Sequence, residues 1–343
     1  MLLLARLAAG KTQQEVCSEL DMSQAKYSKL EVGVIREGDI ELVQKISVLL
    51  QRPPSFFYQK AEIFGRAAPF NFRKRASYPA KMREKAEALA NICRLHIRKI
   101  LDHSPLKANL PSAEIMKGAT PESAAKLIRE FWKVPKGPIA NVTKLMEDAG
   151  IVVILSEFDT HLLDGFTIAD DSPTPLVFQN MMSPGDRLRF TLAHELGHIL
   201  LHRTIQVEDV VEKEADLFAA AFLMPEEEIA GSLKQVGLRE LADLKPKWKA
   251  SMAALLMRSR NLQQISDNQY RFLWSQMARY GYKTREPASL DIPREEPSLL
   301  KRLIHTYARG AETELDFLTQ LKNDFPTIRG EDLLGVPKSG QKH

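Results

Sequence analysis

Residues 189–202 constrain this chain more than any other stretch, because they place two histidines and a glutamate in an apolar, helix-forming sequence. The stretch reads Arg-Phe-Thr-Leu-Ala-His-Glu-Leu-Gly-His-Ile-Leu-Leu-His. Residues four apart on an α-helix are separated by roughly 40° around its axis, so His194 and His198 project from one face, one turn apart. Two such imidazoles can bind one zinc ion. Glu195 lies about 100° from His194 around the axis, where its carboxylate can act as general base toward a water molecule on the metal.

A third ligand is expected from a second helix, because a hydrolytic zinc site needs three protein ligands and one open position. Residues 212–225 predict this helix, which Pro225 ends. Glu212 and Asp216 are one turn apart on it. Glu212 can therefore bind the metal while Asp216 accepts a hydrogen bond from the other ring nitrogen of a ligating histidine. This Glu-x-x-x-Asp arrangement is typical of thermolysin-like zinc peptidases.

Two neighbouring residues leave alternatives open. Glu214 competes with Glu212 as the third ligand. His202 lies about 80° from His194 around the helix axis, so we expect it to support a ligand or the helix end and not to bind the metal. Without the second helix, two histidines in an apolar helix would be read as buried side chains with satisfied hydrogen bonds.

The same residues resemble the peptidase domain of the ImmA/IrrE family. The resemblance covers residues 190–198 with His202 a turn later, then Glu-x-x-Ala-Asp-x-Phe-Ala and a closing Leu-Met-Pro. It implies a zinc endopeptidase directed at a helix-turn-helix repressor. By this resemblance the ligands are His194, His198 and Glu212, and Glu195 is the catalytic carboxylate.

The first 60 residues predict short helices separated by turns. Gly10 ends the first helix, and Thr12 with Glu15 three residues later forms a capping box that opens the second. Ser23 opens a third helix that ends before Gly33. Two short helices joined by a tight turn predict a helix-turn-helix, whose second helix enters the major groove of DNA.

This region is similar to the XRE/Cro-type helix-turn-helix family through Thr-Gln-x-Glu-Val, Ser-Gln and Ser-Lys-Leu-Glu-x-Gly. Glutamine suits adenine edges, and lysine suits phosphate or guanine. The turn departs from the family pattern, since Asp21 stands where glycine is usual. A three-helix interaction module is the alternative. The side chains that the resemblance implies at the DNA are Gln13, Ser23, Gln24, Lys26 and Lys29.

The middle of the chain predicts a helical connector, further helices and a small sheet. Residues 80–103 have helical spacing with the basic residues outward, and residues 61–110 carry an excess of seven positive charges. Such a segment can follow a phosphate backbone or be an ordinary solvated face. Helices are expected at residues 120–132 and 141–149, a loop at 104–112, and strands at 151–155, 165–168 and 176–178. The sheet edge could bind a substrate peptide as an added strand, and His161 is either an oxyanion donor or a surface histidine.

The C-terminal part predicts more helices and no further cluster of ligands. Residues 244–251 and 281–287 resemble segments that follow the peptidase domain in long members of the ImmA/IrrE family. Residues 335–343 are expected to form a frayed tail.

Composition limits the class of protein. The chain has 343 residues, a net charge of +4 and two cysteines, Cys17 and Cys93. This length suits two or three domains. No apolar run is long enough to cross a bilayer, and the cysteines predict no disulfide framework. We therefore expect a cytoplasmic protein without membrane contact.

The sequence thus predicts a mainly α protein with a small β-sheet, an α+β fold. We expect a helix-turn-helix bundle at residues 1–60, a basic connector at 61–115, a zincin-like peptidase domain at 116–235 and a helical region at 236–343. The expected function is a DNA-binding regulator with zinc-dependent endopeptidase activity toward a repressor or antitoxin-like transcription factor. Its partners would be an operator and a protein substrate, and it could form a homodimer. The alternative is a regulator or antitoxin whose peptidase-like domain senses a ligand or binds a toxin without significant cleavage.

Overall fold

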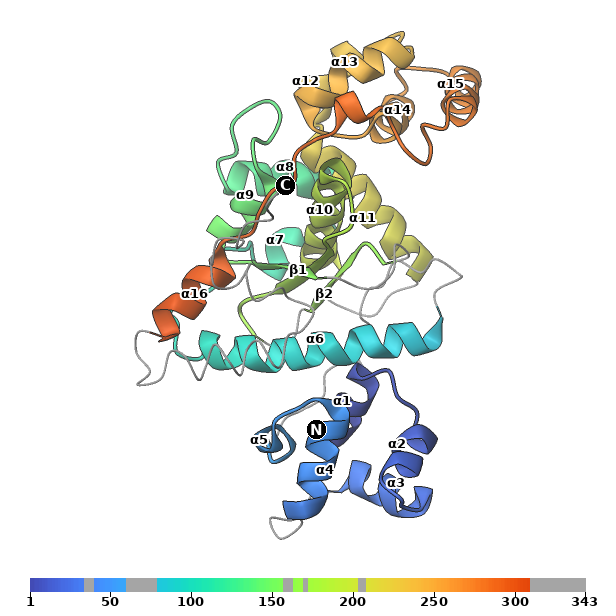
Figure 1. The fold of residues 1–343 in the computed structure, drawn as a ribbon. Helices are drawn as coiled ribbons and strands as arrows, with labels where there is room; N and C mark the ends of the chain where they lie inside the picture. Colours follow the sequence, from blue (N-terminus) through green and yellow to red (C-terminus); the bar gives the residue numbers. More distant parts are fainter. Residues whose placement is uncertain (34–39, 60–78, 157–162, 169–171, 203–207, 309–343) are drawn as a thin grey trace, which may run out of the picture. The chain divides into compact units, whose positions relative to one another are not determined.

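The computed structural model describes residues 1–33, 40–59, 79–156, 163–168, 172–202 and 208–308 (Figure 1). The chain divides into two units, each with its own hydrophobic core. The first unit consists of residues 1–106, 156–163 and 299–343, and the second of residues 107–155 and 164–298.

The first unit begins with the predicted short helices. Its first five are α1 (Leu2–Ala8), α2 (Gln13–Glu19), α3 (Gln24–Val32), α4 (Ile40–Leu50) and α5 (Pro54–Phe57). The capping box of α2 is present, with the Glu15 backbone N–H donating to Thr12 and the Thr12 backbone N–H donating to Glu15. Ser23 caps α3. Local capping thus opens both helices of the helix-turn-helix where the sequence predicts.

The predicted connector is a long helix, α6 (Ala80–Leu101). Ala88 and Ile92 of α6 join the core of the first unit. Helix α16 (Leu299–Ala308) also packs against α6. The expectation that the basic residues of α6 face outward is wrong for Arg94, which is buried. Residues 90–94 are all buried, so this part of the helix is enclosed on several sides.

The second unit contains a small sheet, as predicted. Its strands are β1 (Val152–Ser156), β2 (Gly165–Ile168) and β3 (Leu176–Asn180), in the order β1-β3-β2. β2 and β3 pair antiparallel, with Phe166 opposite Phe178 and the two rings stacked at 5.0 Å between centroids. Strand β3 therefore lies in the middle and β2 at an edge of the described sheet.

Two long helices follow the sheet in the chain. They are α10 (Gly185–Leu201), which carries the His-Glu-x-x-His motif, and α11 (Glu208–Leu223), which begins four residues before the predicted start. α10 packs against α11 and against β2 and β3. Gly197 of α10 faces α11, and a Cβ atom there would lie 3.1 Å from Phe218 Cδ1 and 3.2 Å from Ala215 Cα. The absent side chain therefore allows the two helices to approach closely.

Shorter helices complete the second unit. Before the sheet come α7 (Ala113–Met116), α8 (Pro121–Phe131) and α9 (Val142–Asp148). After α11 come α12 (Glu226–Ile229), the 3-10 turn η1 (Ala230–Leu233), α13 (Leu238–Trp248), α14 (Met252–Asn261), α15 (Asp267–Arg279) and the 3-10 turn η2 (Ala288–Leu290). Thr120 caps α8 and Asn141 caps α9, at the positions the sequence predicts.

Charged side chains link Glu286 and Glu295 to the start of α10. Lys245 is buried and its Nζ contacts Asp186 at 2.5 Å and Glu286 at 2.6 Å. Arg189, also buried, is paired with Glu295. Pairing is required here, since a buried charge without a partner would strongly destabilise the fold.

The predicted fold class is confirmed: the described chain is mainly helical with one small sheet. Among the described helices, none has the length and apolar character needed to cross a membrane. The domain boundaries at residues 60, 115 and 235 stay predictions. His161 and the expected tail at 335–343 lie outside the described residues.

Substituting Gly185 tests the packing at the start of α10. A Cβ atom at Gly185 would lie within 2.6 Å of Pro293 O and closer still to Ile292 O. Because backbone atoms cannot move aside easily, we expect Gly185→Ala to lower the free energy of unfolding by about 1–3 kcal/mol. Gly231→Ala is the matched control, since nothing lies within 4 Å of its Cβ position. Denaturant unfolding of both variants measures the difference, and equal stability would contradict the close contact.

Candidate metal centre

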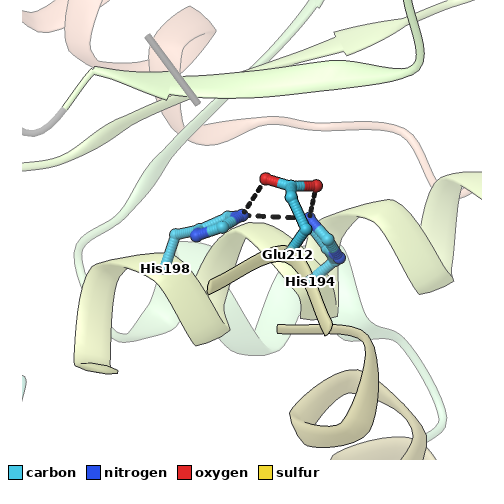
Figure 2. Close-up of side chains that lie close together, drawn as sticks. All are labelled: His194, His198 and Glu212. Carbon is cyan, nitrogen blue, oxygen red and sulfur yellow. Dashed lines mark hydrogen bonds and ion pairs between the residues drawn. The ribbon is translucent and has the colours of Figure 1, made fainter. Parts of the chain in front are cut away.

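Three side chains from α10 and α11 converge on one point (Figure 2). His194 Nε2 and His198 Nε2 lie 3.0 Å apart. Glu212 places Oε2 3.5 Å from His194 Nε2 and Oε1 3.2 Å from His198 Nε2. Among the described residues, these three alone form a group able to hold a metal ion. The structure thus brings Glu212 to the histidine pair, while Glu214 contacts His202.

The chemistry of these atoms fits a cation. Both histidines are buried, and the two Nε2 atoms that face each other carry lone pairs when each neutral ring has its hydrogen on Nδ1. Glu212 Oε2 is also buried and has no hydrogen-bond partner. Acceptors this close repel one another unless a positive charge lies between them. Two imidazole nitrogens with one carboxylate are a usual ligand set for zinc with one position left open.

Asp216 holds His194 in the orientation that a ligand needs. Asp216 Oδ1 lies 2.9 Å from His194 Nδ1, so Nδ1–H donates and Nε2 is left for the metal. Burial lowers the pKa of His194, but the hydrogen bond to Asp216 and the nearby carboxylate of Glu212 outweigh burial and raise the pKa to about 9. Burial raises the pKa of the Glu212 carboxyl, but the close contacts with His194 and His198 outweigh burial and hold that pKa well below its usual range.

Glu195 lies next to the three residues as a buried carboxylate. Burial raises its pKa, although the nearby histidines oppose the shift. Thr167 of β2 donates its hydroxyl to Glu195 Oε2 at 2.6 Å. Sequence reasoning missed Thr167. The strand at 165–168 was predictable, but no sequence signal shows which of its side chains meets α10.

His202 occupies the end of α10 and does not join the three converging residues. Its Nδ1 lies 2.9 Å from His198 Nδ1, and its Nε2 lies 3.0 Å from Glu214 Oε2. Burial lowers the pKa of His202, with the Glu214 hydrogen bond opposing. His202 therefore contacts His198 on the side away from Glu212, and Glu214 contacts His202.

In the first unit, the side chains expected at DNA gather on α2 and α3. Gln13 and Gln24 are the first residues of these helices, and Gln24 Nε2 donates to Gln13 Oε1 at 3.4 Å. Gln13 Nε2 donates to Glu31 Oε2 at 2.6 Å. Arg6 pairs with Glu31 at 2.5 Å. The two glutamines are thus held in one chain of hydrogen bonds.

The other predicted DNA contacts lie on the exposed side of α3. Lys26 and Lys29 are exposed, and Ser23 is exposed while its oxygen caps the helix. Asp21 has a φ of 49°, the left-handed conformation that glycine usually supplies in this turn. Aspartate tolerates this conformation better than most residues, so the departure from the family pattern preserves the turn.

Comparison with known proteins gives one family match in the N-terminal part of the chain and one in the part that contains the candidate metal centre. Residues 146–260 match the family model of the IrrE N-terminal-like domain. Residues 2–57 match the family model of a helix-turn-helix domain. The predicted combination of the two domains is therefore confirmed.

A relative with a named activity is the radiation response metalloprotease IrrE of Deinococcus radiodurans. It is 33% identical over 103 residues, which are 26% of this chain and 31% of that protein. The match thus spans about a third of the relative's length. This similarity supports a metallopeptidase family for the second unit.

The pKa of His194 predicts how the metal-free protein responds to pH. The folded-state pKa is raised from 6.5 to about 9. Protonated His194 therefore stabilises the fold fully below pH 6.5, and this contribution is lost as the pH rises through about 9. We expect the free energy of unfolding to fall by on the order of 1–3 kcal/mol across this window.

Denaturant unfolding with a chelator present, at a series of pH values, measures this loss. Asp216→Asn removes a carboxylate that raises the pKa, so its curve should be flatter than that of the native protein. Parallel curves for the two proteins would contradict the assignment.

Proposed function

Because residues 146–260 form an IrrE N-terminal-like domain behind a helix-turn-helix domain, we propose that this chain is a DNA-binding regulator that also cleaves a protein with a zinc-dependent peptidase site. One observation carries the peptidase proposal. His194, His198 and Glu212 converge within 4.8 Å, with the buried carboxylate of Glu195 beside them. The proposed ligands are these three, and the proposed base is Glu195.

In the proposed hydrolysis of a peptide bond, each residue of the site has a separate role. When bound, zinc supplies a Lewis acid for the scissile carbonyl and lowers the pKa of water. Glu195 takes the proton of the attacking water and passes it to the leaving amine. Thr167 donates to Oε2 of Glu195, so the proton would be carried on Oε1. Asp216 keeps the Nε2 lone pair of His194 directed at the metal.

The sheet offers a place for the substrate backbone. β2 pairs with β3 on one side and carries Thr167, the residue that contacts Glu195. A peptide added along the other side of β2 would form backbone hydrogen bonds and lie close to the catalytic carboxylate. This placement favours an extended segment of a protein over a folded surface.

We propose that the substrate is a repressor or antitoxin-like transcription factor, as the family resemblance implies. The proposed location is the cytoplasm, in keeping with a DNA-binding domain and with two free, buried cysteines. The competing function is a sensor or toxin-binding module that retains the site without significant cleavage. A cleavage assay separates the two.

Glu195→Gln tests the peptidase proposal. The amide keeps the size and the Thr167 contact of the carboxylate but cannot take a proton. We expect zinc content to stay near one ion per chain and cleavage to fall by at least about 100-fold. The assay measures bound zinc and proteolysis of transcription factors encoded beside this protein.

Thr167 supplies the matched control pair. Thr167→Ser keeps the hydroxyl that donates to Glu195, and Thr167→Val keeps the shape without it. We expect the serine variant to retain more activity than the valine variant. If native protein and Glu195→Gln cleave equally, or if the native protein binds zinc but cuts no candidate, the sensor function is favoured.

The hydrogen-bond chain in the first unit supports a base preference at DNA. The Glu31 carboxylate accepts, so the Gln13 amide nitrogen faces it and the Gln13 oxygen faces Gln24. The Gln24 amide then has its oxygen and one N–H left. This pair matches the donor and acceptor that adenine presents in the major groove. We propose that Gln24 reads an adenine, and that Lys26 and Lys29 contact phosphates.

DNA binding of selected operators tests this proposal. We expect Gln24→Ala to weaken binding by about 1–3 kcal/mol and to relax the preference at one base pair. Lys29→Ala should weaken binding about equally for all sequences and lower the slope of log K against log salt by about 1. Lys144→Ala, which removes an exposed charge from the second unit, is the control. Loss of affinity without any change in base preference for Gln24→Ala would contradict adenine reading.

A further inference from the structure

Next to the candidate metal centre, a third histidine, His202, contacts the ring of the proposed ligand His198. The His202 side chain is only 3% exposed, and its Nδ1 lies 2.9 Å from Nδ1 of His198, one turn earlier on α10. On its other side, His202 Nε2 lies 3.0 Å from Glu214 Oε2 of α11. Glu214 is partly exposed, with 39% of its side chain accessible. Glu214, His202 and His198 thus form a hydrogen-bonded chain that begins at the partly exposed carboxylate and ends at the proposed metal ligand.

The direction of each hydrogen bond in this line follows from its outer end. The carboxylate of Glu214 accepts, so His202 Nε2 carries the hydrogen and donates it. A neutral His202 then has a lone pair on Nδ1. That lone pair accepts from His198 Nδ1–H across 2.9 Å. His198 therefore carries its hydrogen on Nδ1, and its Nε2 lone pair faces Glu212 and His194.

We infer that His202 and Glu214 act as a positioning pair that fixes the tautomer and ring orientation of His198 for metal binding. This inference rests on the proposed metal site. It assigns His202 a task that Asp216 performs directly for His194, where the carboxylate lies 2.9 Å from Nδ1. Both histidines of the centre are thus linked to a carboxylate of α11. His194 contacts Asp216 directly, and His198 is linked to Glu214 through the imidazole of His202.

The positions of His198 and Glu214 explain why the His202 ring lies between them. His198 lies one turn closer to the end of α10 than His194, and Glu212 occupies the space in front of both rings. Glu214 is within reach of His202 and not of His198. The imidazole of His202 spans this gap because its two nitrogens lie on opposite sides of one rigid ring, one accepting and one donating. No other side chain has this pair of groups in a flat ring.

Two substitutions of equal shape test the role of His202. His202→Asn keeps an acceptor oxygen near the place of Nδ1, whereas His202→Leu has no acceptor. We expect the leucine variant to bind zinc roughly 10- to 100-fold more weakly, the loss that removal of such partners typically causes, and the asparagine variant to lie closer to the native protein. Competition with a chelator at constant pH measures the affinity, and thermal unfolding of the metal-free proteins identifies any variant that fails to fold.

The tautomer itself is a second readout, independent of activity. Nitrogen-15 shifts of the histidine rings in the metal-free protein should show His198 with hydrogen on Nδ1 in the native protein and in His202→Asn. The leucine variant should shift toward hydrogen on Nε2. A general loss of packing would not produce this selective change at one ring.

A double-mutant cycle tests whether Glu214 acts through His202. Glu214→Ala should weaken zinc binding in the native background and have little further effect in the His202→Leu background. If His202→Leu binds zinc as tightly as the native protein and keeps the Nδ1–H tautomer, or if the two substitutions add independently, the positioning pair is ruled out while the metal site stands. If the native protein binds no zinc, the proposed function fails, and this inference fails with it.

Discussion

The close packing of α10 against α11 is the contact on which the candidate site depends. It occurs at Gly197, where a side chain would press on Phe218 and Ala215. Glycine inside a helix costs about 1 kcal/mol relative to alanine, and here that cost is offset by the approach of the two helices. From α11, the Glu212 carboxylate reaches both histidines of α10, at 3.5 Å from His194 Nε2 and 3.2 Å from His198 Nε2.

Around this contact, four carboxylates have four different surroundings. Glu212 faces the two ring nitrogens, Asp216 orients His194, and Glu214 reaches His202. Glu195 is buried and receives a hydroxyl from β2. Burial penalises a charge that has no partner. The buried Glu195 accepts from Thr167, whereas the buried Oε2 of Glu212 has no hydrogen-bond partner and faces the two histidines.

The chain joins this site to a DNA-binding module with a separate core. In the first unit, a carboxylate again sets the direction of hydrogen bonds, since Glu31 orients Gln13 and through it Gln24. In the second unit, ion pairs link Glu286 and Glu295 to the start of the histidine-bearing helix. The function that we propose uses both units, one to find an operator and one to cut a protein that acts there.

The sequence alone determined the local features of this protein. The caps at Thr12 and Ser23, the helical spacing of His194 and His198, and the strand at 165–168 depend on neighbouring residues, so they were predictable. Only the tertiary structure decided that Glu212 and not Glu214 faces the histidines, that Thr167 meets Glu195, and that His202 lies behind His198. Such choices depend on the rotation of one helix against another and on strand register, where a shift of one residue turns a side chain to the opposite face. No local pattern in the sequence records that rotation, because it is set by the packing of residues far apart in the chain.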